Sequence, residues 1–284
     1  HTDLVMYSLV KNNISLHTLK LTAVRCLGEL SLLAMGIYLR ELHTLILINC
    51  KCALSELSTI RSHCTNLKTF EVYYQRLSPF VDDQPIDHFD LVFSFITTLT
   101  IHTTTLSDEQ FIYIAQTNPN MQKLNIVSHE RTSGYVLSSD ALCEGLMYLC
   151  NLEEFDVELS IYPENKALRL EDVVLIALVQ HCPKLTFVDI SGHSNLSNNA
   201  IAGLACLPVL KKLVVNYCMN LSDDGICFIA EHCPQLRTIC LSSCAHITGV
   251  GINALAQHCR RLAIVQFQNC EQLQNNDIRN FIRR

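Results

Sequence analysis

The sequence lacks the features that would place it in a membrane, on a nucleic acid or around an active site. It has no stretch of about 18 or more uncharged apolar residues, and its opening HTDLVMYSLV lacks the basic start and cleavage site of a signal peptide. Lysine and arginine form no basic run, and a net charge of −6 argues against a general nucleic-acid binder. No nucleophile–base pair, glycine-rich phosphate loop or set of metal ligands stands out, so we expect no enzyme, cofactor or metal.

The C-terminal part of the chain repeats itself. Four segments align in register: CPKLTFVDISGH (182–193), LPVLKKLVVNYC (207–218), CPQLRTICLSSC (233–244) and CRRLAIVQFQNC (259–270). Their first leucines, Leu185, Leu210, Leu236 and Leu262, lie 25, 26 and 26 residues apart. This period and leucine spacing predict a leucine-rich-repeat solenoid, in which each repeat contacts only its neighbours. Such proteins bind partners, so we expect a recognition surface.

Six weaker copies of the same pattern precede these four. They are Leu16-Leu19-Leu21, Leu42-Leu45-Leu47, Cys64-Leu67-Phe70, Ile96-Leu99-Ile101, Met121-Leu124-Ile126 and Leu152-Phe155-Val157. The alternation of apolar residues in each copy predicts a short strand. We therefore expect a single α/β leucine-rich-repeat domain of about ten repeats over residues 1–284, a horseshoe with parallel strands on the concave face and helices on the convex face.

A second signature lies between the strands. The segments LSDEQFIYIAQTNPNM (106–121), LSDDGICFIAEHCPQL (221–236) and ITGVGINALAQHCRRL (247–262) align, with apolar residues at helical spacing. Serine or threonine stands where it can cap the start of each helix. The expected N-caps are Ser107, Ser138, Ser197, Ser222 and Thr248.

The chain has fifteen cysteines, and eight of them occupy repeated positions. Cys50, Cys218, Cys244 and Cys270 close strand segments, and Cys64, Cys182, Cys233 and Cys259 stand three residues before a first leucine. A small buried hydrophobe suits both positions, and free cysteine serves well there. The odd total predicts a reducing compartment, the cytosol or the nucleus. The His-Cys pairs recur once per repeat, with no second pair to complete a zinc site.

The two signatures together resemble the cysteine-containing leucine-rich repeats of F-box proteins. The pattern C-x2-L-x2-L-x-L-x2-C, followed by [IL]-[ST]-D-x-G-[IL], is clearest over 207–270 and persists back to Leu16. The resemblance implies the substrate-recognition module of a Skp–cullin–F-box type E3 ubiquitin ligase. Its repeats would hold a protein substrate, and an F-box would bring the Skp adaptor and cullin. The chain opens on His1 and contains no F-box, so we interpret it as the repeat portion of a longer protein.

One strand is unusually acidic. Because the leucines of each strand point into the core, their neighbours face the concave surface. On the sixth strand these neighbours are Glu154, Asp156 and Glu158, with Asp189 on the next strand. Like charges side by side favour a docking site for a basic protein segment. The alternative is a solvated acidic strand without a partner.

Three insertions lie close to this strand, at residues 73–90, 128–136 and 159–167. Insertions at one point of the repeat emerge on one edge of a solenoid, which is often the binding edge; the alternative is drift in tolerant loops. The candidate partner-binding residues are Glu71, Tyr73, Tyr74, Asp82, Asp83, His129, Arg131, Glu154, Asp156, Glu158, Tyr162 and Asp189.

Three functions fit a repeat protein of this kind. The first is the ligase adaptor, and the second is a stand-alone binding or inhibitory scaffold that uses the same concave face. The third is a GTPase-activating leucine-rich protein. Its repeats are longer, it tends to have an acidic tail that this chain lacks, and it would need an exposed arginine or asparagine cluster. The sequence therefore favours the first two.

Overall fold

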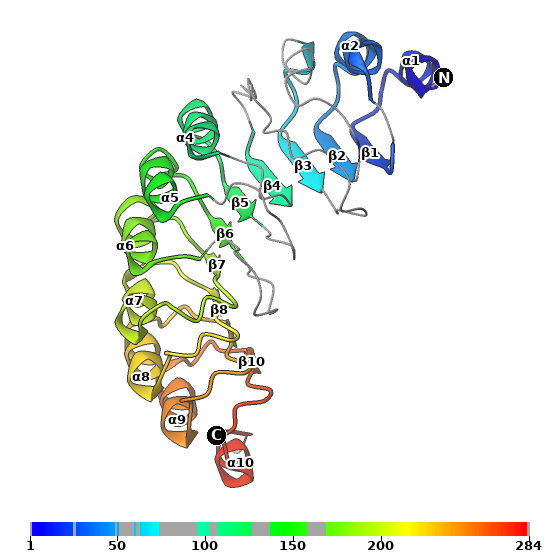
Figure 1. Cartoon of the computed structure of the whole chain (residues 1–284). Coiled ribbons are helices and arrows are strands. Elements are labelled where there is room, and N and C mark those ends of the chain that lie inside the picture. Colours follow the sequence, from blue (N-terminus) through cyan, green and yellow to red (C-terminus); the bar gives the residue numbers. More distant parts are fainter. Residues whose placement is uncertain are drawn as a thin grey trace, which may run out of the picture.

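The computed structural model describes residues 2–24, 27–48, 50, 60, 63–73, 96–102, 107–126, 137–157 and 169–282. In this part of the chain, ten parallel strands form one sheet in the order of the sequence. The sheet curves, with the strands along the inside of the arc and the helices along the outside (Figure 1). Among the described helices, none combines the length and apolar character needed to cross a membrane.

The strands coincide with the ten predicted segments. They are β1 (Thr18–Thr22), β2 (Thr44–Ile48), β3 (Thr69–Tyr73), β4 (Thr98–His102), β5 (Lys123–Ile126), β6 (Glu154–Asp156), β7 (Phe187–Asp189), β8 (Lys212–Val214), β9 (Thr238–Cys240) and β10 (Ile264–Gln266). Their register places equivalent repeat positions side by side, as in Leu124↔Phe155 and Phe155↔Val188. Each strand therefore presents the same position of its repeat to the next strand.

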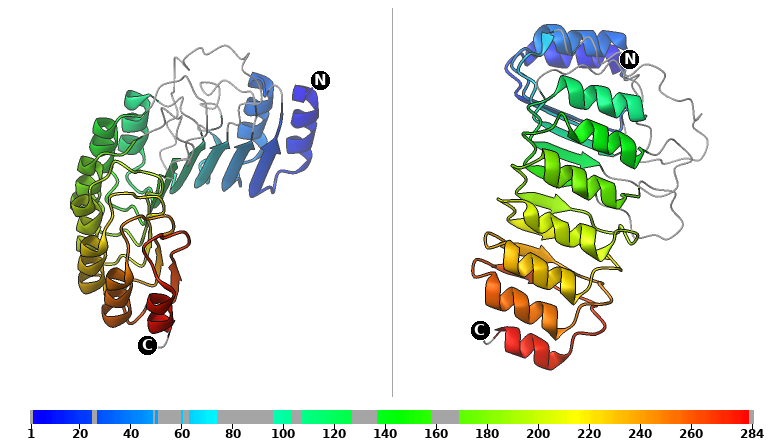
Figure 2. Two further views of the ribbon diagram at one scale, coloured as in Figure 1. Left: turned by 60° about the horizontal axis from the view of Figure 1, so that its bottom comes forward. Right: turned by 90° about the vertical axis from the view of Figure 1, so that its left-hand side faces the viewer.

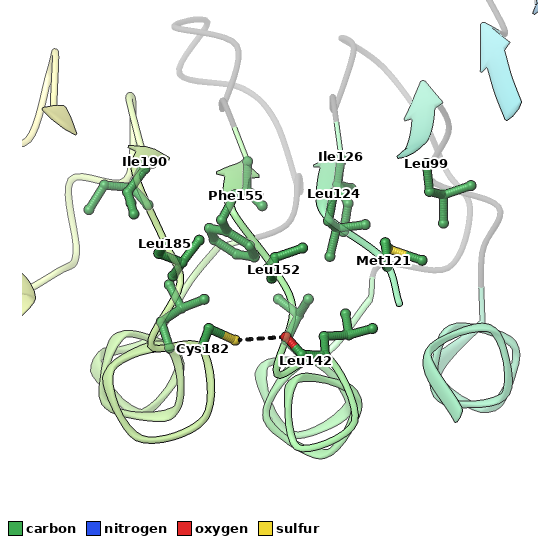
Figure 3. Close-up of a cluster of buried hydrophobic side chains, with 14 of the residues drawn as sticks. Leu99, Met121, Leu124, Ile126, Leu142, Leu152, Phe155, Cys182, Leu185 and Ile190 are labelled. Atoms are coloured by element: carbon green, nitrogen blue, oxygen red, sulfur yellow. Dashed lines mark hydrogen bonds between the residues drawn. The ribbon is translucent and has the colours of Figure 1, made fainter. Parts of the chain in front are cut away.

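The core lies between the strands and the helices, in one continuous stack. Leu124 of β5, Phe155 of β6 and Val188 of β7 are at most 1% exposed. Figure 3 shows Leu124 and Phe155 in line with Ile190, pointing from the strands toward the helix layer. The alternation of buried and more accessible residues along strands such as β1, β2, β6 and β7 produces this stack, because successive side chains leave opposite faces of a strand.

The helices form a single layer on the convex side (Figure 2). They are α1 (Thr2–Asn12), α2 (Glu29–Tyr38), α4 (Asp108–Thr117), α5 (Ser139–Leu146), α6 (Asp172–His181), α7 (Asn198–Gly203) with the 3₁₀ turn Leu204–Cys206, α8 (Asp223–His232), α9 (Gly249–His258) and α10 (Asn275–Ile282). The side chains of Ser107, Ser138, Ser197 and Thr248 cap their helices as predicted. Ser222 is at the predicted N-cap position, but its side chain makes no capping hydrogen bond.

A polar ladder connects the starts of successive helices. From α4 to α8, the first residue of each helix accepts a hydrogen bond from the backbone N–H that immediately precedes the next helix. The pairs are Asp108 with Ser138 (2.8 Å), Ser139 with Glu171 (3.2 Å), Asp172 with Ser197 (2.9 Å), Asn198 with Ser222 (3.0 Å) and Asp223 with Thr248 (2.9 Å). We call this series the N-terminal ladder. It satisfies one N–H per helix that the helix itself leaves without a partner.

The ladder also explains the glycines of the D-x-G turn. Asp223 Oδ1 accepts a further hydrogen bond from the N–H of Gly251 (3.0 Å), and a Cβ on Gly251 would lie 2.6 Å from that oxygen. A Cβ on Gly225 would likewise collide with Oδ1 of Asn198. In this turn the aspartate therefore accepts hydrogen bonds from the following repeat. The glycine lacks the Cβ that would collide with the acceptor of the preceding repeat.

Eight buried cysteines form a second inter-repeat ladder. Each lies where its thiol can donate to a backbone carbonyl of the preceding repeat. Examples are Cys244 to Val215 O (3.1 Å), Cys270 to Leu241 O (3.1 Å) and Cys182 to Leu149 O (3.5 Å). Burial raises the pKa of these thiols, to about 12 for Cys244, so they are structural thiols rather than nucleophiles.

The ladder makes a prediction for Asp223. Asp223→Ala removes the acceptor for three donors, the N–H groups of Thr248 and Gly251 and the hydroxyl of Thr248 (2.5 Å). We expect the free energy of unfolding in urea to fall by about 2–3 kcal/mol, because partly buried donors lose their partner. The control is Asp224→Ala, in the same helical turn but exposed, which should cost less than about 1 kcal/mol. Equal losses for the two variants would contradict the ladder.

Candidate partner-binding surface

The concave face gathers several charged residues where β5 to β8 meet, apart from Lys20 of β1 and Glu71 of β3. Register places Lys123 of β5 beside Glu154 of β6, then Phe187 of β7 and Lys212 of β8. In the next row Asn125, Asp156 and Asp189 are neighbours. We call these seven residues the polar concave patch. It alternates positive, negative and aromatic groups over four strands.

Glu154 is not an unbalanced carboxylate. Its Oε1 lies 2.6 Å from Nζ of Lys123, and the two side chains are 37% and 47% exposed. Docking of a basic segment on this strand stays a prediction, but Glu154 already has a counter-charge within the chain. The signal that could have shown it is the position of Lys123, which is equivalent to Glu154 in the preceding repeat.

Asp189 is the more buried acid of the patch. Burial raises the pKa of its carboxyl group, while hydrogen bonding from Ser191 and the charge of Lys212 oppose that rise. The N–H of Ser191 donates to Asp189 Oδ1 at 2.9 Å. The Lys212 ammonium lies 4.1 Å from the centre of the Phe187 ring, so one lysine serves both an aromatic face and a carboxylate.

The structure brings together only some of the predicted site residues. Glu154, Asp156 and Asp189 meet on β6 and β7, whereas Glu71 and the backbone of Tyr73 belong to β3, with β4 and β5 in between. The remaining predicted residues lie outside the described residues: Tyr74, Asp82, Asp83, His129, Arg131, Glu158 and Tyr162. The described part of β6 ends at Asp156, so the idea of three carboxylates on one strand remains a prediction.

A buried histidine fixes the chain on both sides of the third insertion. His193 takes the position that cysteine occupies in the following repeats, and it is fully buried. Its Nε2 lies 2.7 Å from the carbonyl of Val157, and its Nδ1 accepts from the N–H of Leu170 at 3.1 Å. Asn195 adds a hydrogen bond to the carbonyl of Leu170 at 2.6 Å. The ends of the segment 158–169 are therefore held beside the acidic strand.

This histidine predicts an acid-sensitive stability. Burial lowers the pKa of His193 to about 4, although the hydrogen bond to Val157 acts to raise it. In the unfolded chain the pKa of a histidine is about 6.5. The unfolded chain therefore takes up the proton first, and stability falls as pH drops from about 6.5 to about 4. At pH 5 we expect a loss of about 2 kcal/mol relative to pH 7, measured by urea unfolding.

The matched control for this measurement is His193→Cys, the residue that stands at the equivalent position as Cys218 and Cys244. This variant should lose the histidine's share of the pH dependence, although it also loses the hydrogen bond to Leu170. The same slope in both proteins between pH 7 and pH 5 would show that His193 does not titrate as described.

Comparison with known proteins identifies the fold. No protein-family model matches the chain, and no curated protein does. Among solved structures, the TLR13–ssRNA13 complex is similar, with a TM-score of 0.59 and 16% identity over 94% of this chain. The yeast Rad7–Elc1 complex (15% identity, 86% of this chain and 83% of that chain) and the Drosophila Toll–Spätzle complex (12%, 91% of this chain) have TM-scores of 0.39 and 0.48.

The chain spans about a third of the TLR13 and Toll chains, 35% and 37% of their lengths. At 16% identity and a TM-score of 0.59, the likeness to the TLR13 structure concerns the fold alone. Together with the ten-stranded parallel sheet and its outer helix layer, it shows an α/β leucine-rich-repeat horseshoe. The fold prediction is therefore confirmed.

Proposed function

We propose that the chain is the substrate-recognition module of a Skp–cullin–F-box type E3 ubiquitin ligase that acts in the cytosol or nucleus. In this role it binds a protein partner and performs no chemistry itself. The observation that carries the proposal is the use of both signature elements between repeats: cysteine thiols facing preceding carbonyls, and the D-x-G turn that begins at Asp223 facing the next helix. These are the elements that resemble F-box leucine-rich repeats.

The polar concave patch supports a protein partner over a nucleic acid. The fold does not decide this, since the similar TLR13 structure is a complex with ssRNA13. In this chain, Asp156 and Asp189 lie on adjacent strands at the centre of the patch, where they would repel phosphate groups. Fixed charges of both signs on a rigid sheet instead suit the mixed polar surface of a protein.

The ligase role predicts a specific set of companions. The endogenous protein, immunoprecipitated with an antibody against residues 169–282, should retain the Skp adaptor and cullin, detected by immunoblot. A known F-box protein from the same lysate serves as the positive control. If that control retains both while this protein retains neither, the ligase role is wrong, and a stand-alone binding or inhibitory scaffold takes its place.

The concave patch predicts where the substrate binds. Glu154→Lys places a second cation beside Lys123 and should weaken binding of a co-purified substrate by about tenfold, measured with purified components. Thermal unfolding should change little, because an exposed ion pair contributes at most about 1 kcal/mol. Thr18→Lys is the control, at the equivalent position of β1, four strands from β5. Equal binding by both variants would exclude the patch as the docking surface.

A further inference from the structure

The C-terminal repeats gather basic side chains along one edge of the solenoid. Six exposed residues from four repeats belong to it: Lys184, Lys211, Lys212, Arg237, Arg260 and Arg261. They stand in the short turns that lead from a helix end into a strand, or at the strand's first residue. We call them the basic edge. Because they are distributed over four repeats, no basic run appears in the sequence.

Backbone hydrogen bonds align the turns of the basic edge from one repeat to the next. The N–H of Lys211 donates to Thr186 O (2.8 Å), that of Arg237 to Lys211 O (2.7 Å), and that of Ala263 to Arg237 O (2.8 Å). Lys211 and Arg237 are therefore direct neighbours, one strand spacing of about 4.8 Å apart. Arg261 reaches Gln235 of the preceding repeat through Nη1, which keeps its guanidinium at the same edge.

The basic edge has little opposing charge of its own. Between residues 181 and 263, all of which the structure describes, there are four acids. Asp189 lies in the concave patch, and Asp223 and Asp224 begin α8 at the opposite edge, which leaves Glu231 near the basic edge. One repeat before the edge, exposed Glu153 takes the turn position of Lys211 and Arg237. None of the six cations forms an ion pair within 4.0 Å among the described residues, where the observed pair is Lys123–Glu154.

The fold accounts for how this cluster is tolerated. The helices α6, α8 and α9 end at the same edge, with His181, His232 and His258 in their last turns. The partial negative charge of helix C-termini favours nearby cations. That charge stays within the last turn and cannot replace a carboxylate partner for exposed arginines. Lys184 and Arg261 already bond to the neutral amides of Asn151 and Gln235, and Lys212 covers Phe187 close to Asp189. Lys211, Arg237 and Arg260 are therefore the members most available to an external anion.

We infer that the basic edge is the docking surface for an acidic segment of a protein partner. Three strand spacings from β7 to β10 measure about 15 Å, the length of about five extended residues. Arginine forks pair with carboxylates, or with phosphorylated side chains of a peptide, through two parallel hydrogen bonds. The inference rests on the proposed function only in taking the partner to be a protein.

A nucleic acid fits this edge less well than an acidic peptide does. Single strands bind basic grooves through bases stacked on free aromatic rings. The nearby rings are already occupied: Lys212 covers Phe187, and Phe228 stacks on His232 with ring centres 4.1 Å apart. The net charge of −6 also repels a long polyanion beyond the short basic edge.

The test measures binding of a labelled peptide to the chain of residues 1–284 by fluorescence anisotropy. The peptide has about ten residues, alternating Asp/Glu with Ser/Gly, roughly twice the length of the edge. The variant Arg237→Glu/Arg260→Glu should weaken binding by about tenfold or more, and added salt should weaken binding to the unmodified chain. The control Arg40→Glu/Lys68→Glu places the same changes at equivalent repeat positions in the N-terminal repeats, and it should bind as the unmodified chain does.

Three outcomes would overturn the inference. They are no detectable peptide binding, equal losses in the two double variants, or tighter binding of a single-stranded oligonucleotide of the same charge than of the peptide. Circular dichroism of both variants separates lost binding from lost folding. The result is distinct from the ligase question, because recovery of the Skp adaptor and cullin from cells does not depend on the acidic peptide.

Discussion

The structure depends on one recurring interaction: from α5 to α9, the N–H that precedes each helix finds its acceptor on the preceding helix. In a single helix, the first N–H groups have no internal partner. Here the first residue of the preceding helix supplies an acceptor, from Asp108 to Asp223, over five consecutive steps. The helices are therefore fixed in height and rotation relative to one another, and the strand register on the other side of the core follows.

The buried cysteines also link neighbouring repeats by hydrogen bonds, and they occupy little volume. A thiol fills the volume of a small hydrophobe and still offers a weak donor to a carbonyl of the neighbouring repeat, as Cys244 does to Val215. His193 shows what the position requires when the chain between two repeats is longer. Its ring spans the distance that a thiol cannot, and it bonds the backbone on both sides of residues 158–169. The exchange makes this one repeat sensitive to acid.

The fold was predictable because its signals are local. The leucine spacing sets every strand, and Ser107, Ser138, Ser197 and Thr248 mark helix starts through a motif of a few residues. Ser222 fits the same motif but makes no capping bond, and its N–H is instead satisfied by Asn198 of the preceding repeat. The pairing of Glu154 with Lys123 was missed for a similar reason: it joins residues 31 positions apart, one repeat away. To predict contacts between side chains of different repeats, the register of the strands must be known as well as the motif within each repeat.

The same geometry determines where charge can accumulate. The described helices alternate with parallel strands and run in one direction, so their N-termini share one edge of the helix layer (Figure 2) and their C-termini the other. Acids such as Asp172 and Asp223 act as ladder acceptors at the first edge, where the helix dipoles also favour them. Cations are favoured at the second edge for the converse reason. Each repeat can thus add one or two basic residues there at small cost to its own stability, and stacking four such repeats concentrates them.

The concave strands between the two edges carry charges of both signs, and there Lys123 and Lys212 lie close to Glu154 and Asp189. A partner that crosses from the concave patch to the basic edge therefore meets charges of both signs first and mainly positive charge second. An acidic segment of that partner is favoured over the basic edge, and this difference orients the partner on the surface.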